Sequence, residues 1–122
     1  MDINQRLHKA SLNPKINKNT IYDTWAKTYD EYIKKQKYTG PNELVEHLYM
    51  LIFEREREDI QHDTIFNKEN EKINILDFGC GTGLVGKEIR NKMIIACLDG
   101  IDISNKMLTE CSKKKCYNKL FN

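Results

Sequence analysis

The residue types that could do chemistry are concentrated in one glycine-rich stretch, residues 77–83, with the sequence DFGCGTG. A mostly apolar run precedes it over residues 73–76, and Leu84 and Val85 follow it. This order predicts a strand, a tight turn and the start of a helix. Because glycine lacks a Cβ and tolerates positive φ, such a turn lets a ligand approach the backbone closely.

Two phosphate-binding patterns match this stretch. Residues 81–87 satisfy the P-loop pattern G-x-x-x-x-G-K, but Glu88 stands where a P-loop has the serine or threonine that binds magnesium. A carboxylate there would also repel phosphates, which disfavours a nucleotide triphosphatase. Gly81, Gly83 and Gly86 satisfy the dinucleotide fingerprint, and Asp102 lies about as far downstream as a ribose-binding acid should. An NAD(P)-binding Rossmann module of an oxidoreductase is therefore an alternative.

A third interpretation accounts for two acidic residues. Asp77, at the carboxyl end of the expected strand, would repel a pyrophosphate and attract a cationic amino-acid group. S-adenosylmethionine carries such a group, an ammonium beside a sulfonium, and Asp102 could accept hydrogen bonds from both of its ribose hydroxyls. Asp102 can equally be explained as a carboxylate at the start of a helix, where the helix dipole favours it.

Two helices are expected before the strand. The first begins at Thr20, with Asp23 completing something close to a capping box. Its apolar and aromatic residues recur at helical spacing and either pack in the core or cover a ligand pocket: Ile21, Trp25, Tyr29 and Tyr32. The second helix begins near Pro41 and is expected to pack on a sheet through a wide apolar stripe. That stripe consists of Leu44, Val45, Leu48, Tyr49, Leu51 and Ile52.

The remaining segments complete the expected order. Residues 1–19 lack sustained periodicity and are expected to form a mobile arm. Residues 54–59 are expected to be a solvated helix end and residues 61–72 a loop. After the turn, we expect a helix over 84–91, a strand that ends at 101–102 and a helix from the cap Ser104 to about Cys116. The result is a βαβ unit in a two-stranded parallel sheet.

Two segments together resemble a known family. Residues 77–83 and 100–108 (GIDISNKML) look like motif I and the region after it in class I S-adenosylmethionine-dependent methyltransferases. Residues 22–30, Gly40-Pro41 and residues 115–120 resemble the methyltransferase-like protein 27 (Williams-Beuren syndrome region) family. The resemblance covers residues 20–121. It implies an α/β fold, the N-terminal part of a Rossmann-like methyltransferase domain with N-terminal helices followed by β-α-β-α.

The resemblance also implies a cofactor and its site. The cofactor is S-adenosylmethionine, with the turn around its methionine moiety, one carboxylate near the ammonium, another on the ribose and aromatic rings closing over the methionine end. A ring near a sulfonium adds cation-π attraction of about 1 kcal/mol. By this resemblance, the turn residues are Gly79, Gly81 and Gly83, with Asp77 near the ammonium and Asp102 on the ribose. Tyr29 and Trp25 would close over the methionine end, and Ile103 and Met107 would flank the adenine. No residue stands out as a catalytic base, and the methyl acceptor is not indicated.

The family fold has further strands, with adenine-binding and catalytic segments after the third and fourth. We therefore expect residues 20–122 to be a partial methyltransferase domain, marginally stable alone and without turnover. A cofactor-binding fragment that acts only by pairing with another chain is the alternative to an enzyme. Edge strands left unpaired in so small a sheet support this expectation.

Composition sets broader limits. The chain has 122 residues, 31% of them charged, and a net charge of +2, so it shows no basic signature of a nucleic-acid-binding protein. The basic run at 113–115 suits a helix end. No signal peptide or spanning segment is evident, which predicts a cytoplasmic or nuclear protein with reduced thiols. Its four cysteines and three histidines lie at no metal-site spacing.

Overall fold

The computed structural model spans residues 1–122, and the structure is described for residues 1–53 and 73–122. The expectations for residues 54–59 and 61–72 lie outside the described residues. Three helices come first: α1 (Ile3–Ser11), α2 (Lys18–Lys35) and α3 (Gly40–Phe53). They are followed by β1 (Asn74–Phe78), α5 (Leu84–Lys92), β2 (Cys97–Ile101), α6 (Asn105–Lys113) and β3 (Lys119–Phe121).

The sheet is parallel and has three strands in the order β1-β2-β3. The expected βαβ unit is confirmed, with Asp77 beside Gly100 and Phe78 beside Ile101 in the register. The expectation of only two strands is wrong, because Lys119–Phe121 pairs with β2. A strand of three residues is too short to show a period of two in the sequence.

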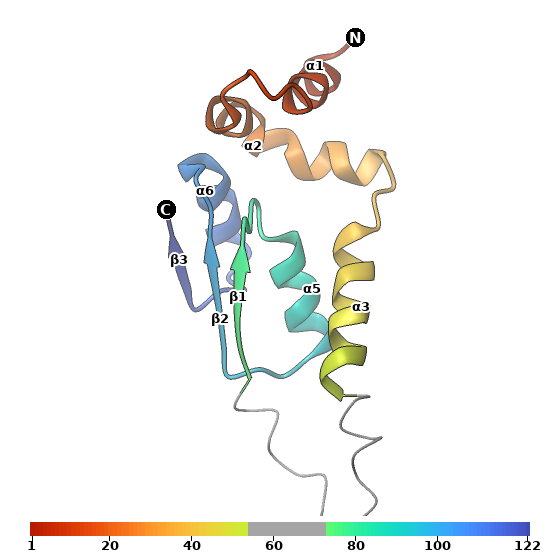
Figure 1. Ribbon diagram of the computed structural model, residues 1–122, viewed down its shortest axis with the longest axis vertical. Coiled ribbons are helices and arrows are strands. Elements are labelled where there is room, and N and C mark those ends of the chain that lie inside the picture. The colour runs from red at the N-terminus through yellow and green to blue at the C-terminus, as the bar shows by residue number, and fades with distance from the viewer. Residues whose placement is uncertain (54–72) are drawn as a thin grey trace, which may run out of the picture.

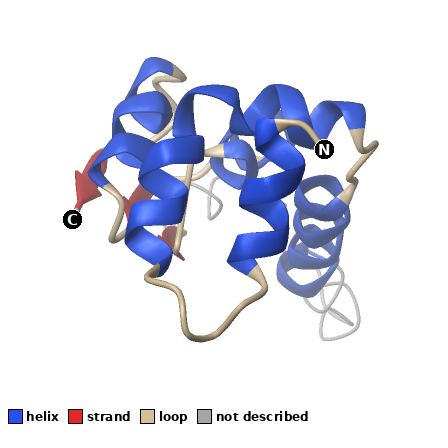
Figure 2. Ribbon diagram, turned by 90° about the horizontal axis from the view of Figure 1, so that it is seen from above, coloured by secondary structure: helices blue, strands red, loops and turns tan. Residues whose placement is uncertain are grey.

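The helices cover one face of the sheet and the carboxyl ends of its strands. Leu98, fully buried in β2, packs with Ile89 of α5 and Val45 of α3 in one apolar cluster. Leu108 and Cys111 of α6 belong to a second cluster, against which β3 packs. In Figure 1, α1 and α2 lie across the end to which the β1 and β2 arrows point, and Figure 2 shows this helical layer from above. The functional candidates after β1 and β2 therefore face α2.

The N-terminal segment is more regular than expected. Ile3–Ser11 forms a helix, although residues 1–19 show no sustained periodicity in the sequence, and the expected mobility of this arm stays a prediction. The missed signal is a capping box, in which the Asp2 carboxylate accepts from Gln5 N at 2.8 Å and Gln5 Oε1 accepts from Asp2 N at 3.0 Å. Leu7 and Ala10 then pack against the buried residues of α2.

The two expected helices, α2 and α3, are confirmed, but α2 begins earlier than expected and α3 packs on a different element. α2 begins after the N-cap Asn17, whose side chain accepts from the amides of residues 19 and 20, and not after Thr20. α3 has Pro41 in its first turn, as expected, but it packs mainly against α5 rather than on the sheet. Of the expected stripe of α3, Leu44 and Leu51 are exposed and only Val45 is fully buried. The apolar contact face of α3 is thus narrower than its sequence indicates.

Ser104 is the N-cap of α6, as expected, and its hydroxyl accepts from Met107 N at 3.1 Å. The helix ends at Lys113, short of the expected Cys116. Among the helices of the described part of the chain, none is long and apolar enough to cross a bilayer.

Candidate functional site

The glycine turn lies between β1 and α5 and is fastened to the end of β2. Gly79 and Cys80 both donate their amides to the Ile101 carbonyl, at 2.8 and 3.0 Å. Gly79 and Gly81 have φ of 80° and 54°, and a Cβ at either position would meet no atom within 4 Å. Their side of the turn is therefore open, with backbone that a side chain would otherwise cover. Open backbone at this turn is what its glycines predict from the sequence.

Asp102, just after β2, braces this turn. One carboxylate oxygen accepts from Gly81 N at 2.8 Å, and the other accepts from Ser104 N at 2.8 Å. Each oxygen keeps a further acceptor position, because an ionised carboxylate offers about four in all. The carboxylate thus braces the start of α6, as the helix-start explanation expects, and the ribose explanation stays a prediction.

A cavity of about 520 Å³ opens at the carboxyl ends of β1 and β2. Its volume is within the range of small-molecule sites. Six of the nine residues that the resemblance assigns to the cofactor line it: Gly79, Gly81, Asp102, Ile103, Met107 and Tyr29. The structure thus brings together the turn, the carboxylate after β2, the start of α6 and an aromatic residue of α2.

Three of the assigned residues lie elsewhere. Asp77 points to the helix-covered face, where its carboxylate accepts from the Tyr117 hydroxyl at 2.6 Å. Trp25 is 3% exposed and packs in the core between α1 and α2, against His8 and Tyr32. Gly83 is the N-cap of α5 and faces Cys111. The structure therefore does not support a direct contact of Asp77, Trp25 or Gly83 with a ligand in the cavity.

The cavity also has lining residues that the sequence analysis did not assign. Tyr22 and Tyr38 join Tyr29 on its α2 side, and Pro41 and Leu44 come from the start of α3. Tyr22 lies two helical turns before Tyr29 on the same face, so helical spacing alone could have identified it. Tyr38 and Leu44 gave no such signal, because their place depends on the turn between α2 and α3. The exposed Leu44 is thus explained as part of the cavity wall.

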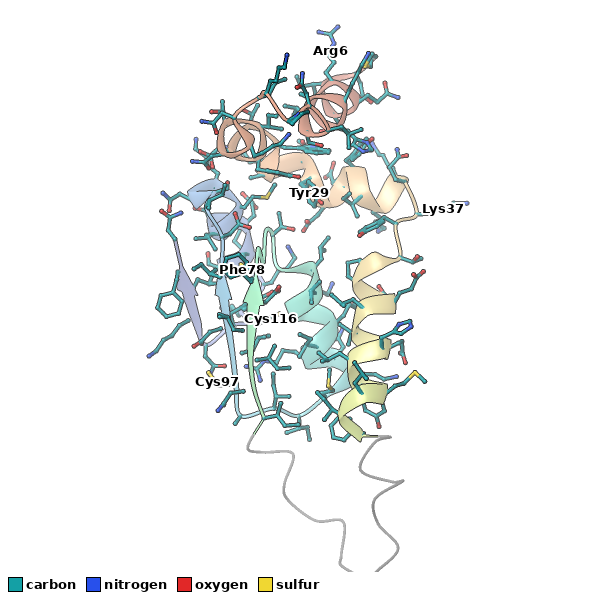
Figure 3. The ribbon with its side chains drawn as sticks, in the orientation of Figure 1. Arg6, Tyr29, Lys37, Phe78, Cys97 and Cys116 are labelled. Carbon is teal, nitrogen blue, oxygen red and sulfur yellow. The ribbon has the colours of Figure 1, made fainter. Side chains whose placement is uncertain are left out.

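Tyr29 lies beneath α2, between this helix and the strand ends (Figure 3). Its ring packs edge-on against Trp25, with centroids 5.0 Å apart. Burial, with smaller contributions from Tyr22, Tyr38 and Asp30, raises the pKa of Tyr29 to about 12. The phenol is therefore neutral at physiological pH and presents its ring and an O–H donor to the cavity.

A pair of cysteine thiols lies under the turn. Cys80 lines the cavity, and behind it Cys111 is fully buried. The neighbouring Cys111 thiol, together with burial, raises the pKa of the Cys80 thiol. Cys80 is therefore a neutral thiol that fills space. Within residues 1–53 and 73–122, no cluster of histidine, cysteine and acidic side chains could hold a metal ion.

No family model matches the chain. In sequence, it is 32% identical over 100 residues to malonyl-acyl-carrier protein O-methyltransferase 2 of Ilyobacter polytropus. This match covers 82% of the chain and 30% of that relative.

In fold, the chain is similar to two solved structures that share under 25% identity with it. One is the DhpI–SAH complex, with a TM-score of 0.51, 19% identity and coverage of 84% of this chain and 41% of that chain. The other is the complex between the Haloferax volcanii Trm112 methyltransferase activator and a methyltransferase, with a TM-score of 0.52 and 14% identity. That match covers 83% of this chain and 38% of that chain.

The predicted fold class, an α/β arrangement with a parallel sheet, is confirmed by these matches. The chain spans less than half the length of each of these three proteins. In sequence, the chain is similar to part of an O-methyltransferase, and in fold to part of the DhpI–SAH complex and of a methyltransferase.

Proposed function

We propose that the cavity binds S-adenosylmethionine and that the chain is part of a methyltransferase whose acceptor is not indicated. The observation that carries the proposal is the cavity itself, which joins open backbone at Gly79 and Gly81 to the Asp102 carboxylate. The names of the relatives support it: an O-methyltransferase in sequence and a complex with SAH in fold. The finer likeness to the methyltransferase-like protein 27 family, and a cytoplasmic or nuclear location, are proposals from the sequence alone.

The residues present fit the two ends of this cofactor. The remaining acceptor positions of Asp102 suit the ribose hydroxyls, and Ile103 and Met107 offer apolar surface for the adenine. At the other end, the first intrahelical bond of α5 runs from Lys87 N to the Gly83 carbonyl. Leu84 and Val85 line the cavity, and because their amides precede this bond and have no intrahelical partner, they can donate to the methionine carboxylate.

Tyr29 completes the methionine end of the proposed site. Its neutral ring can face the sulfonium, an attraction worth about 1 kcal/mol, and its hydroxyl can donate to the cofactor. Bound S-adenosylmethionine supplies an electrophilic methyl group. In the proposed site, the turn, Asp102 and Tyr29 would bind and orient that group, and such positioning is a large part of what methyl transfer needs.

The structure changes one argument for this cofactor. The sequence favoured S-adenosylmethionine over a dinucleotide because Asp77 would repel a pyrophosphate, but the Asp77 carboxylate points to Tyr117 instead. The preference now rests on the relatives, because Asp102 would accept from the ribose hydroxyls of either cofactor. A direct competition between the two cofactors is therefore the decisive experiment.

Equilibrium binding of S-adenosylhomocysteine and NAD to the 122-residue chain tests the proposal. We expect the first to bind, and NAD to compete poorly. Asp102→Ala should lower the affinity about 10- to 100-fold, since hydrogen bonds to a charged acceptor are worth about 1.5–3 kcal/mol.

Asp99→Asn is the matched control, because Asp99 is in β2 but its carboxylate accepts from Lys119 N at the strand edge, outside the cavity. This variant should keep the affinity of the original chain. If NAD binds and S-adenosylhomocysteine does not, the proposed function is wrong and the oxidoreductase interpretation takes its place. Asp102→Asn, with a melting curve, separates a loss of binding from a loss of folding.

A further inference from the structure

Two acidic residues of α2 hold this helix against the opposite wall of the cavity. The Asp30 carboxylate accepts from the Thr82 hydroxyl at 2.5 Å and from Lys114 Nζ at 2.5 Å. The Asp23 carboxylate accepts from the Ser104 hydroxyl at 2.5 Å and from Lys106 N at 3.3 Å. α2 is thus fastened at two points, one over the glycine turn and one over the start of α6.

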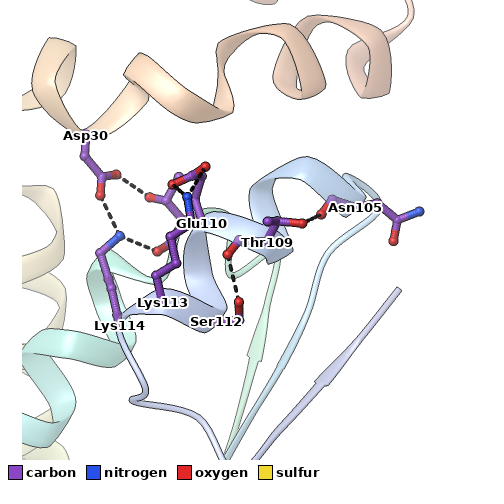
Figure 4. A network of polar contacts seen from close by, with 8 residues as sticks. Asp30, Asn105, Thr109, Glu110, Ser112, Lys113 and Lys114 are labelled. Carbon is purple, nitrogen blue, oxygen red and sulfur yellow. Dashed lines mark hydrogen bonds and ion pairs between the residues drawn. The ribbon is translucent and has the colours of Figure 1, made fainter.

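The contact at Asp30 joins three segments that are far apart in the sequence. Lys114, the C-cap of α6, also donates to the Thr82 carbonyl at 2.6 Å. Figure 4 shows Asp30 extending down from α2 and Lys114 extending up from the end of α6 to meet it. Thr82 belongs to the turn and is 2% exposed. We call the group Asp30, Thr82 and Lys114 the clamp.

The position of the clamp relative to the cavity suggests a role. Asp30 directly follows Tyr29, and Asp23 directly follows Tyr22, and both tyrosines line the cavity. Each carboxylate therefore fixes the part of α2 that presents a cavity tyrosine. Because Thr82 itself lines the cavity, the clamp sets the distance between Tyr29 and the turn.

The clamp differs from an ordinary surface ion pair. The Lys114 side chain is 19% exposed and that of Asp30 is 39% exposed. The two residues belong to different segments, and both also bond to Thr82 in a third segment. Charge-assisted bonds in a partly buried network are stronger than exposed pairs, which contribute little. In the pair between Lys113 and Glu110, next along α6, the lysine is 63% exposed and both residues belong to one helix.

We propose that the clamp holds Tyr29 over the cavity and slows cofactor release, so that Asp30 and Lys114 are positioning residues and not ligands. This inference rests on the proposed function. Neither residue lines the cavity, so their effect on a ligand must pass through Tyr29 and Thr82. Opening of the clamp would free α2 at one point while the Asp23 contact keeps it attached at the other.

A double-mutant cycle with Asp30→Asn and Lys114→Met tests the clamp. Affinity and dissociation rate of S-adenosylhomocysteine are measured well below the melting temperature, with fluorescence of Trp25, the single tryptophan of the chain, as the signal. Each single variant should raise the dissociation rate about 5- to 20-fold. The double variant should release S-adenosylhomocysteine no faster than the faster of the two single variants, because both changes break the same contact.

Two further variants separate positioning from general destabilisation. Lys114→Arg keeps the positive charge and should recover much of the slow release, and Lys113→Met removes the neighbouring lysine and should change nothing. Losses that add in the double variant, or single variants that release the cofactor at the original rate, would overturn the inference.

Amide hydrogen exchange of residues 18–35 gives a readout that needs no cofactor. Without ligand, Asp30→Asn should speed exchange in the second half of α2 more than in the first half, which Asp23 still holds. If the original chain binds no S-adenosylhomocysteine, the proposed function fails while this measurement still decides on the clamp. Unchanged exchange in Asp30→Asn would show that no clamp exists.

Discussion

At the scale of single residues, the side chains in and beside the cavity divide into those that would meet a ligand in the proposed site and those that arrange others. Asp102 does both, since it braces Gly81 and Ser104 and keeps acceptor positions free. Asp77 belongs to the second group, because Tyr117 occupies its carboxylate. Tyr29 belongs to the first group, and its buried environment raises the pKa of its phenol.

The raised pKa of Tyr29 predicts a specific loss of stability in alkali. The folded chain holds the phenolic proton to a pKa of about 12, against 10.0 for an ordinary tyrosine. The stabilisation is therefore complete below about pH 10 and is lost as the pH rises from 10 towards 12.

Denaturant unfolding of the original chain and of Tyr29→Phe across this interval measures the effect. We expect the free energy of unfolding of the original chain to fall more steeply, because the phenylalanine variant has no proton to lose at this position. Parallel curves would contradict the environment described for Tyr29.

At the scale of elements, the packing of α5 against the end of the chain depends on one small residue. Gly86 of α5 donates its amide to the Tyr117 hydroxyl at 3.0 Å. A Cβ at this position would lie 2.2 Å from the Tyr117 ring. The helix can therefore approach the segment before β3 only because residue 86 has no side chain.

Gly86→Ala should lower the free energy of unfolding by about 1–3 kcal/mol, the usual cost of overpacking. This outcome runs against helix propensity, by which alanine is the better residue in the middle of a helix. Urea unfolding measures it, with the exposed neighbour Lys87→Ala as the matched control. A Gly86→Ala chain as stable as the original would show that Tyr117 does not pack as described.

At the scale of the whole molecule, the two faces of the sheet differ. The covered face carries Leu98 and Gly100, both buried, whereas Leu76 and Phe78 on the other face are 61% and 85% exposed. In the register, Phe78, Ile101 and Phe121 form one row across the three strands. Alternation along each strand sends this row away from the helices, so it forms an apolar patch on the surface of the described structure.

The 122-residue chain should therefore bind a hydrophobic dye and self-associate at micromolar concentration. Replacing Phe78 by lysine should lower both dye binding and association, while Ile94→Lys, an exposed apolar residue outside the strands, should change them less. Dye fluorescence and sedimentation velocity measure the two effects. A monodisperse chain with a sharp, cooperative melt and no dye binding would contradict this prediction and the expectation of marginal stability.

The sequence alone determined the features that depend on neighbours in the chain. Glycine spacing predicted the turn, Ser104 predicted the start of α6, and helical spacing predicted α2 and α3, because backbone preference and capping act over a few residues. The capping box of α1 is a signal of the same local kind. Six of the nine expected cofactor residues line one cavity because the carboxyl ends of parallel strands meet at one edge of the sheet.

Only the tertiary structure decided where side chains turn and which distant segments meet. The partner of Asp77 is forty residues away at Tyr117, and the partners of Asp30 are still further along the chain. Trp25 is buried in the core and Tyr29 lines the cavity, although both belong to α2. The orientation of these side chains depends on packing and on the pairing of buried polar groups across the whole domain, so local sequence patterns do not predict it.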